Sequence, residues 1–110
     1  MQQNGQAAVV TIVGDMDALT AEEVTQYLGT QIESGQKALV ADLSRVDFMS
    51  SAGLRAILGV AKAARSLGGD FRLADPQPGV YRTLNLAGFS SFLQIFPTVN
   101  EAVASFGPAG

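Results

Sequence analysis

The chain of 110 residues contains no histidine, no cysteine and no tryptophan. Without histidine it cannot build a Ser-His-Asp triad or a histidine site for zinc or iron. Without cysteine it has no thiol nucleophile, no iron–sulfur cluster and no disulfide. An enzyme built from this sequence would depend on Asp, Glu, Lys, Ser or Tyr alone. We therefore predict a protein that is not an enzyme, with no catalytic residue, no cofactor and no metal site.

Charged residues are also scarce, at 15% of the chain against about 25% in an average domain. Seven basic and ten acidic residues give a net charge of −3, and residues 1–55 hold three of the basic and seven of the acidic groups. Nucleic-acid binding requires a basic stripe, and this sequence has none. The pattern predicts no nucleic-acid partner and places any acidic face in the N-terminal half.

Long apolar segments are missing as well. Residues 1–6 are polar and uncharged, unlike a signal peptide, which opens with a basic region before an apolar run. The longest uncharged segment, residues 83–100, is interrupted by polar residues and Pro97, whereas a membrane span needs about 20 mostly apolar residues. We expect a cytoplasmic protein that does not insert into a membrane.

The residues that are present predict one globular domain, because 47% are hydrophobic and the length is that of an ordinary domain. Short apolar runs typical of strands occupy residues 7–13, 37–43, 71–74 and 92–96. They alternate with segments of helical periodicity. This order predicts an α/β fold with four or five strands in a mixed, largely parallel sheet.

The helix boundaries are indicated by capping residues. Thr20 and Glu23 have capping-box spacing, and this helix is expected to end near Gly35. A second helix, over residues 54–67, is followed by the stop signal Gly68–Gly69. Two further helices have clear start signals: Pro78 opens one that ends at Gly88, and Thr98 with Glu101 forms a capping box for the other.

The segment 42–55, DLSRVDFMSSAGLR, is the best candidate for a functional site. We expect a turn containing Phe48 and Met49 after the strand, and then Ser50 and Ser51 at a helix N-terminus. Unpaired N–H groups and the helix dipole would hold a phosphate there, although either serine could also simply be an N-cap. A hydrolase using Ser51 would need G-x-S-x-G and a base; Met49 replaces the first glycine and the chain has no histidine. We expect no turnover of an activated ester.

From about Gln6 to Phe106 the chain resembles STAS domains of the anti-sigma factor antagonist family. The resemblance rests on the order and spacing of four blocks: GDMD at 14–17, DLSRVDFMSSAGL at 42–54, GGDFRLAD at 68–75 and LNLAGFSSFLQIFPTVNEAV at 84–103. It implies a single STAS domain over residues 1–110, with a frayed tail at 107–110.

The resemblance also implies a partner-switching mechanism. Members of the family bind an anti-sigma factor that is a serine kinase of ATPase fold, which frees the sigma factor. Phosphorylation of a serine at the helix start breaks the complex, and a phosphatase resets it. The positions implied to contact the partner are Asp15, Asp17, Asp47, Met49, Ser50, Ala52, Gly53 and Arg55.

One departure from the family motif D-S-[ST]-G affects the phosphorylation site. When the motif is aligned on Gly53, the acceptor position is Ala52, which has no hydroxyl. We predict Ser51 as the acceptor, with Ser50 as the second choice. The alternative is a STAS module that is not phosphorylated here and belongs to another complex, such as a lipid-transport subunit or a sensor assembly. A pull-down separates them, since the first predicts a kinase of ATPase fold and the second a transporter ATPase.

Three further features accompany these serines. Asp42 and Asp47 are expected to form a polar rim around them. Arg55, in the first turn of the helix, opposes the helix dipole and suggests a contact with a carboxylate or a phosphoserine. The apolar residues of 89–96 exceed what one face of a strand can bury, which suggests an interaction patch.

Overall fold

The structure is a computed structural model that describes residues 2–4 and 7–107. Its strands and helices follow one another in the order β1 Gln2–Asn4, β2 Ala7–Met16, α1 Ala18–Glu33, β3 Ala38–Met49, α2 Ser51–Ser66, β4 Asp70–Ala74, α3 Pro78–Leu86, the 3-10 turn η1 Phe89–Ser91, β5 Ile95–Phe96 and α4 Val99–Ala104.

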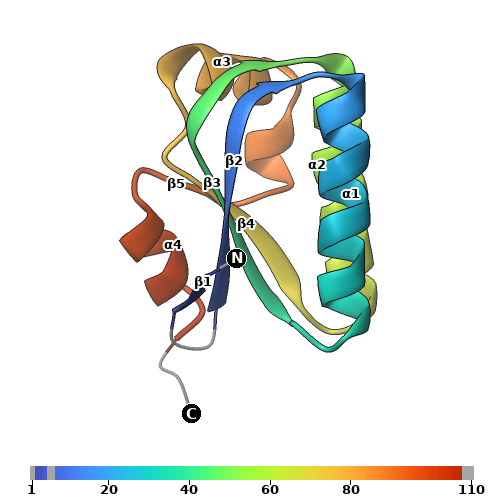
Figure 1. Ribbon diagram of the computed structural model, residues 1–110. Helices are drawn as coiled ribbons and strands as arrows, with labels where there is room; N and C mark the ends of the chain where they lie inside the picture. The colour runs from blue at the N-terminus through green and yellow to red at the C-terminus, as the bar shows by residue number, and fades with distance from the viewer. Residues whose placement is uncertain (1, 5–6, 108–110) are drawn as a thin grey trace.

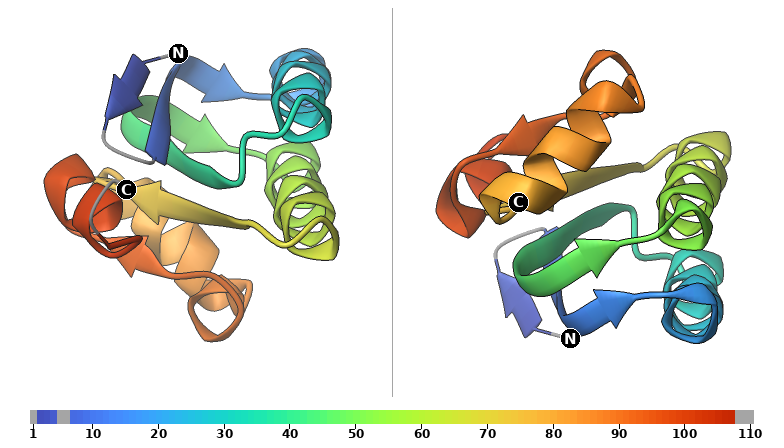
Figure 2. Two further views of the ribbon diagram at one scale, coloured as in Figure 1. Left: turned by 90° about the horizontal axis from the view of Figure 1, so that it is seen from below. Right: turned by 90° about the horizontal axis from the view of Figure 1, so that it is seen from above.

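The strands form one sheet in the order β1-β2-β3-β4-β5, antiparallel between β1 and β2 and parallel elsewhere. Helices α1 and α2 lie side by side on one face, and α4 covers part of the other (Figures 1 and 2). The predicted α/β fold with a mixed, largely parallel sheet is therefore confirmed. The expected tail falls mostly on residues 108–110, which lie outside the described residues.

Two apolar clusters hold these layers together. The larger lies between the sheet and helices α1, α2 and α3, and includes Leu39, Ile57 and Phe71. The smaller lies under α4, where Val40 and Ala102 are fully buried. Because α4 spans only the amino-terminal half of the strands, the carboxyl-terminal halves of β2 and β3 stay open on that face, and Val13 is 64% exposed.

Strand β3 is longer than predicted, and the turn expected at Phe48 and Met49 is wrong. Both residues belong to β3, whose last pair with β2 is Met49 opposite Met16. The predicted strand stopped where the continuous apolar run stops. Beyond that point Val46 and Met49 are buried, whereas Asp47 and Phe48 between them are exposed, and the register against β2 shifts between Val46 and Phe48.

Helix α1 starts at Ala18, and its N-cap lies three residues before the predicted cap Thr20. Its N-cap is Asp17, whose side chain accepts a hydrogen bond from the Thr20 N–H at 3.0 Å. Both residue types cap helices, but aspartate is the stronger cap, and β2 delivers the chain directly to it. The Thr98 cap of α4 is confirmed, with its hydroxyl accepting from the Glu101 N–H at 3.1 Å.

The strand predicted for residues 92–96 is reduced to Ile95–Phe96. The Phe89 carbonyl accepts hydrogen bonds from the N–H groups of both Phe92 and Leu93, at 3.0 and 2.7 Å, which closes a helical turn. Leu93 is then buried in the larger cluster, while Phe92 stays 38% exposed.

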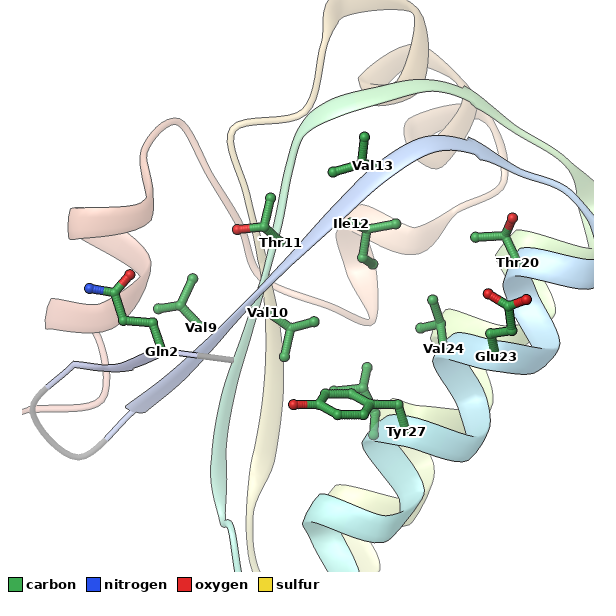
Figure 3. Close-up of a pocket in the computed structure, with 11 residues that line it drawn as sticks. Gln2, Val9, Val10, Thr11, Ile12, Val13, Thr20, Glu23, Val24 and Tyr27 are labelled. Carbon is green, nitrogen blue, oxygen red and sulfur yellow. The ribbon is translucent and has the colours of Figure 1, made fainter.

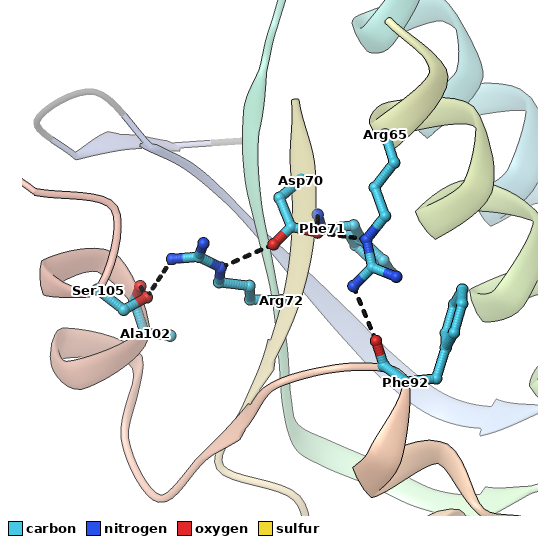
Figure 4. Close-up of polar contacts among 7 residues, drawn as sticks. All are labelled: Arg65, Asp70, Phe71, Arg72, Phe92, Ala102 and Ser105. Carbon is cyan, nitrogen blue, oxygen red and sulfur yellow. Dashed lines mark hydrogen bonds and ion pairs between the residues drawn. The ribbon is translucent and has the colours of Figure 1, made fainter. Parts of the chain in front are cut away.

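The carboxylate of Asp70 on β4 connects, through two arginines, to α2 and to the residues that follow η1 and α4 (Figure 4). Asp70 on β4 pairs with Arg65 on α2 and Arg72 on β4, each at 3.0 Å. Arg65 also donates to the Phe92 carbonyl at 2.8 Å, and Arg72 donates to the Ser105 hydroxyl at 2.7 Å. Burial raises the pKa of Asp70, but hydrogen bonds from Arg65, the backbone and Arg72 outweigh it, so the pKa lies below its ordinary value.

Candidate functional site

The carboxyl ends of β2 and β3 bring the two predicted serines to one corner of the molecule. Met16 and Met49 are paired across the strands, and the Ser50 N–H donates to the Met16 carbonyl at 3.1 Å. Ser50 is the single residue between β3 and α2, so Ser51 is the first residue of the helix.

The Ser50 hydroxyl both accepts and donates a hydrogen bond. It is the N-cap of α2 and accepts a hydrogen bond from the Gly53 N–H at 3.1 Å. It also donates to the carbonyl of Met16, 34 residues earlier in the chain. Because the half-buried Ser50 hydroxyl both donates and accepts a hydrogen bond, it fixes the start of α2 to the end of β2.

The Ser51 hydroxyl stands in contrast to that of Ser50. Its side chain is exposed, and the described part of the chain gives its hydroxyl no hydrogen-bond partner. The backbone N–H groups of Ser51 and Ala52 also have no acceptor among the described residues. They are open donors at the positive end of a 16-residue helix, next to a free hydroxyl.

Gly53 is required by the close approach of α2 to β2. A Cβ atom at this position would lie 2.9 Å from the Met16 carbonyl oxygen and 2.7 Å from the Met49 sulfur. Gly53 and Met49 are buried, so neither offers a partner an exposed side chain. They shape the backbone under the serines instead. Ala52 is half-buried, and its methyl packs against the main core.

The predicted acidic residues divide into two groups. Asp15 and Asp17 are exposed at the end of β2, beside the serines. The hydrogen bond from the Thr20 N–H lowers the pKa of Asp17, the cap of α1. Asp47 is exposed but accepts from the Gln77 amide at 3.4 Å, toward α3.

Asp42 is not part of a rim around the serines. Its carboxylate accepts from the Ser44 N–H at 3.0 Å, and in the sheet it lies opposite Thr11 and Ala74, well before the strand ends. Among residues 2–4 and 7–107, no group of three acidic side chains is placed to hold a metal ion.

Arg55 lies in the second turn of α2 rather than the first, because the helix already starts at Ser51. It is exposed and has no ion-pair partner among the described residues. Together with Glu22 and Ala52 it borders a shallow groove of about 470 Å³ between α1 and α2. A cation therefore lies close to the open helix N-terminus.

An exposed aromatic residue at this corner was not predicted from the sequence. Phe48 is 57% exposed and lies opposite Asp15 in the sheet. In the sequence Val46 and Phe48 alternate with polar residues, as on one face of a strand, so nothing local indicates that Val46 is buried and Phe48 exposed. None of the helices in the described residues is both long and apolar enough to cross a membrane.

This fold is that of a known class of domain. The model of the STAS domain family matches residues 1–102. The chain therefore belongs to the STAS domain family.

Individual proteins of this class are similar along most of the chain. BtrV of Bordetella bronchiseptica, a candidate anti-sigma factor antagonist, is 35% identical over 97 residues, which cover 88% of this chain and 81% of BtrV. An anti-sigma factor antagonist from Mycobacterium paratuberculosis has a crystal structure with a TM-score of 0.85 and 27% identity, over 94% of this chain and 88% of that one. The anti-sigma factor antagonist SpoIIAA, in its unphosphorylated form, gives a TM-score of 0.82 at 21% identity, over 96% and 92%.

Proposed function

We propose that this chain is an anti-sigma factor antagonist. It binds an anti-sigma factor that is a serine kinase of ATPase fold, and it is released when that kinase phosphorylates Ser51. A phosphatase then restores the binding form. The chain itself catalyses nothing and needs no cofactor, and the cycle runs in the cytoplasm.

The observation that carries the proposal is the different use of the two adjacent hydroxyls. Phosphorylation of Ser50 would remove the proton that it donates to Met16 and would break the N-cap of α2. Phosphorylation of Ser51 breaks no hydrogen bond among the described residues, because its hydroxyl is exposed and unpaired there. The names of BtrV and of the Mycobacterium paratuberculosis protein support the choice of partner.

The electrostatics of this corner explain how one phosphate could act as a switch. A phosphoserine carries about −1.5 to −2 charges at neutral pH. Within the chain, the open N–H groups of Ser51 and Ala52 tolerate this charge. Toward a partner, the same charge adds to Asp15 and Asp17 and must be desolvated when the surfaces meet. The switch therefore acts on the complex and leaves the domain folded.

The proposed partner face consists of the exposed residues around Ser51. Asp15 and Asp17 lie at the end of β2, Arg55 lies one helical turn after Ser51, and Asp47 contacts Gln77 toward α3. Ser50 and Ala52 complete this face and are half-buried.

Ala52 favours a second candidate function. The usual acceptor position holds a methyl that packs against the core, so the chain could be a STAS module of another complex that is not regulated here. In that case affinity purification from the native cell recovers a transporter ATPase or a sensor protein, and no phosphate is found on either serine.

The test is phosphosite mapping by mass spectrometry after incubation with ATP and the cognate anti-sigma factor kinase. We expect one phosphate on Ser51 and none in a Ser51→Ala variant. In a binding assay, Ser51→Asp should weaken the complex with the kinase. The control Ser66→Asp places the same charge on an exposed serine at the opposite end of α2 and should bind normally. A phosphate on Ser50, or on neither serine, overturns the assignment.

A further inference from the structure

The sheet has an open edge at β2. Strand β1 pairs only with the first three residues of β2, Ala7–Val9. From Val10 onward, no described strand pairs with β2 on that side. Gly14, with φ of +90°, interrupts the regular strand geometry. The usable open edge is therefore Val10–Val13, where alternate residues direct their N–H and C=O groups outward.

The opposite edge of the sheet, formed by β5, is protected against pairing with another strand. Strand β5 is only two residues long and is followed directly by Pro97. Short edge strands and proline both prevent unwanted pairing. The β2 edge has no proline and no lysine, so it lacks this protection.

A groove of about 640 Å³ runs between the open edge and α1. Figure 3 shows Val10 and Ile12 on the side of β2 that faces α1, with Val24 and Tyr27 across from them. Tyr27 is 43% exposed. A strand added at the edge would place alternate side chains in this groove, against the apolar wall.

The one charged residue among the described residues that line the groove is acidic. Residues 1–36, which include β1, β2 and α1, contain five acidic residues and no lysine or arginine. Glu23 lines the groove and is exposed. The nearest cation of the sheet, Arg45, lies opposite Val13 on β3, one strand in from the edge, and does not line the groove.

We propose that the open edge Val10–Val13 binds an extended, basic segment of a partner protein as an additional strand. The backbone groups of the edge supply the hydrogen bonds, and the groove selects side chains that are apolar or positively charged. Neither Ser50 nor Ser51 lines this groove. The proposal is therefore independent of the phosphorylation switch.

A second copy of this chain is the poorer occupant. Edge-to-edge pairing of two β2 strands would bring the acidic surfaces of both α1 helices toward each other, without a cation from either. Like charges at close range oppose such a pair. A basic segment is attracted to the same surface, and the attraction weakens as salt screens it.

The probe for this site is an octapeptide with blocked ends and the sequence Lys-Lys-Val-Val-Lys-Lys-Val-Val. As a strand it presents both lysine and valine on each face. We expect the backbone amide signals of Val10–Val13 to shift on titration. The outward-facing amides among them should exchange more slowly with deuterium. A peptide with glutamate in place of lysine, and one N-methylated at alternate residues, should bind at least tenfold more weakly.

Two matched variants of the chain locate the contact. Glu23→Gln should weaken binding of the lysine peptide about two- to fivefold. Glu33→Gln removes the same charge ten residues further along α1 and should leave binding unchanged. Equal binding of the glutamate or N-methylated peptide, no change at Val10–Val13, or protection of these amides by dimerisation without peptide would overturn the proposal.

Discussion

Replacing Gly53 with alanine tests the close approach between α2 and the end of β2. The added Cβ would lie 2.7 Å from the Met49 sulfur, which is the end of a flexible side chain and can move. It would also lie 2.9 Å from the carbonyl oxygen of Met16, which is backbone and already accepts hydrogen bonds from the N–H and the hydroxyl of Ser50. Relief of the second contact requires α2 to shift and weakens its cap.

The expected cost follows from opposing effects. Alanine in place of glycine favours a helix by up to about 1 kcal/mol. Overpacking costs about 1–3 kcal/mol, and loss of the N-cap adds about 1 kcal/mol. We therefore expect Gly53→Ala to lower the free energy of unfolding by about 1–3 kcal/mol.

Gly59→Ala is the matched control, in the same helix. A Cβ there meets nothing within 4 Å, so only the helix preference changes and stability should rise by about 0.5–1 kcal/mol. Urea unfolding followed by circular dichroism measures both variants. The reasoning is refuted if Gly53→Ala is as stable as Gly59→Ala.

Three further predictions concern caps and charge. Ser50→Ala should lower the free energy of unfolding in urea by about 1 kcal/mol, whereas Ser51→Ala should change it by less than about 0.5 kcal/mol. Asp17→Ala should lower the melting temperature more than Thr20→Ala, because Asp17 accepts the capping hydrogen bond. Asp70 has a lowered pKa when folded. Its contribution to the free energy of unfolding is therefore present above about pH 4 and is lost as the pH falls through the pKa of the folded state. Urea unfolding at several pH values should show that Asp70→Asn is less stable at pH 7 and depends less on pH between about pH 5 and 2.

Each of these comparisons has an outcome that contradicts it. Equal losses for the two serine variants would mean that the Ser50 cap is not made. A larger loss for Thr20→Ala would restore the capping box predicted from sequence. An unchanged acid dependence in Asp70→Asn would mean that its ion pairs contribute nothing.

The fold was largely predictable because apolar runs and helical periodicity alternate clearly along the chain. Strand β1 was not predictable, since Gln2–Asn4 are polar and are held by backbone pairing with β2. The extent of β3 was misjudged for a related reason. Its second half is covered on one face only, and a sequence does not say where α4 stops covering the sheet.

The position of the site was predictable, but the difference between the two serines was not. Both are good N-caps at a helix start, and local sequence treats them alike. What separates them is the carbonyl of Met16, which engages Ser50 from 34 residues away. The need for glycine at position 53 has the same origin, because the atoms that crowd it belong largely to Met16.

The carboxylate shared by Arg65 and Arg72 affects how parts of the domain unfold locally. Through these arginines, Asp70 connects to the carbonyl of Phe92 after η1 and to Ser105 after α4. Two peripheral segments that barely touch each other thus depend on one side chain. Their local opening should be cooperative, with the amides of η1 and α4 exchanging as one unit and losing protection together in Asp70→Asn.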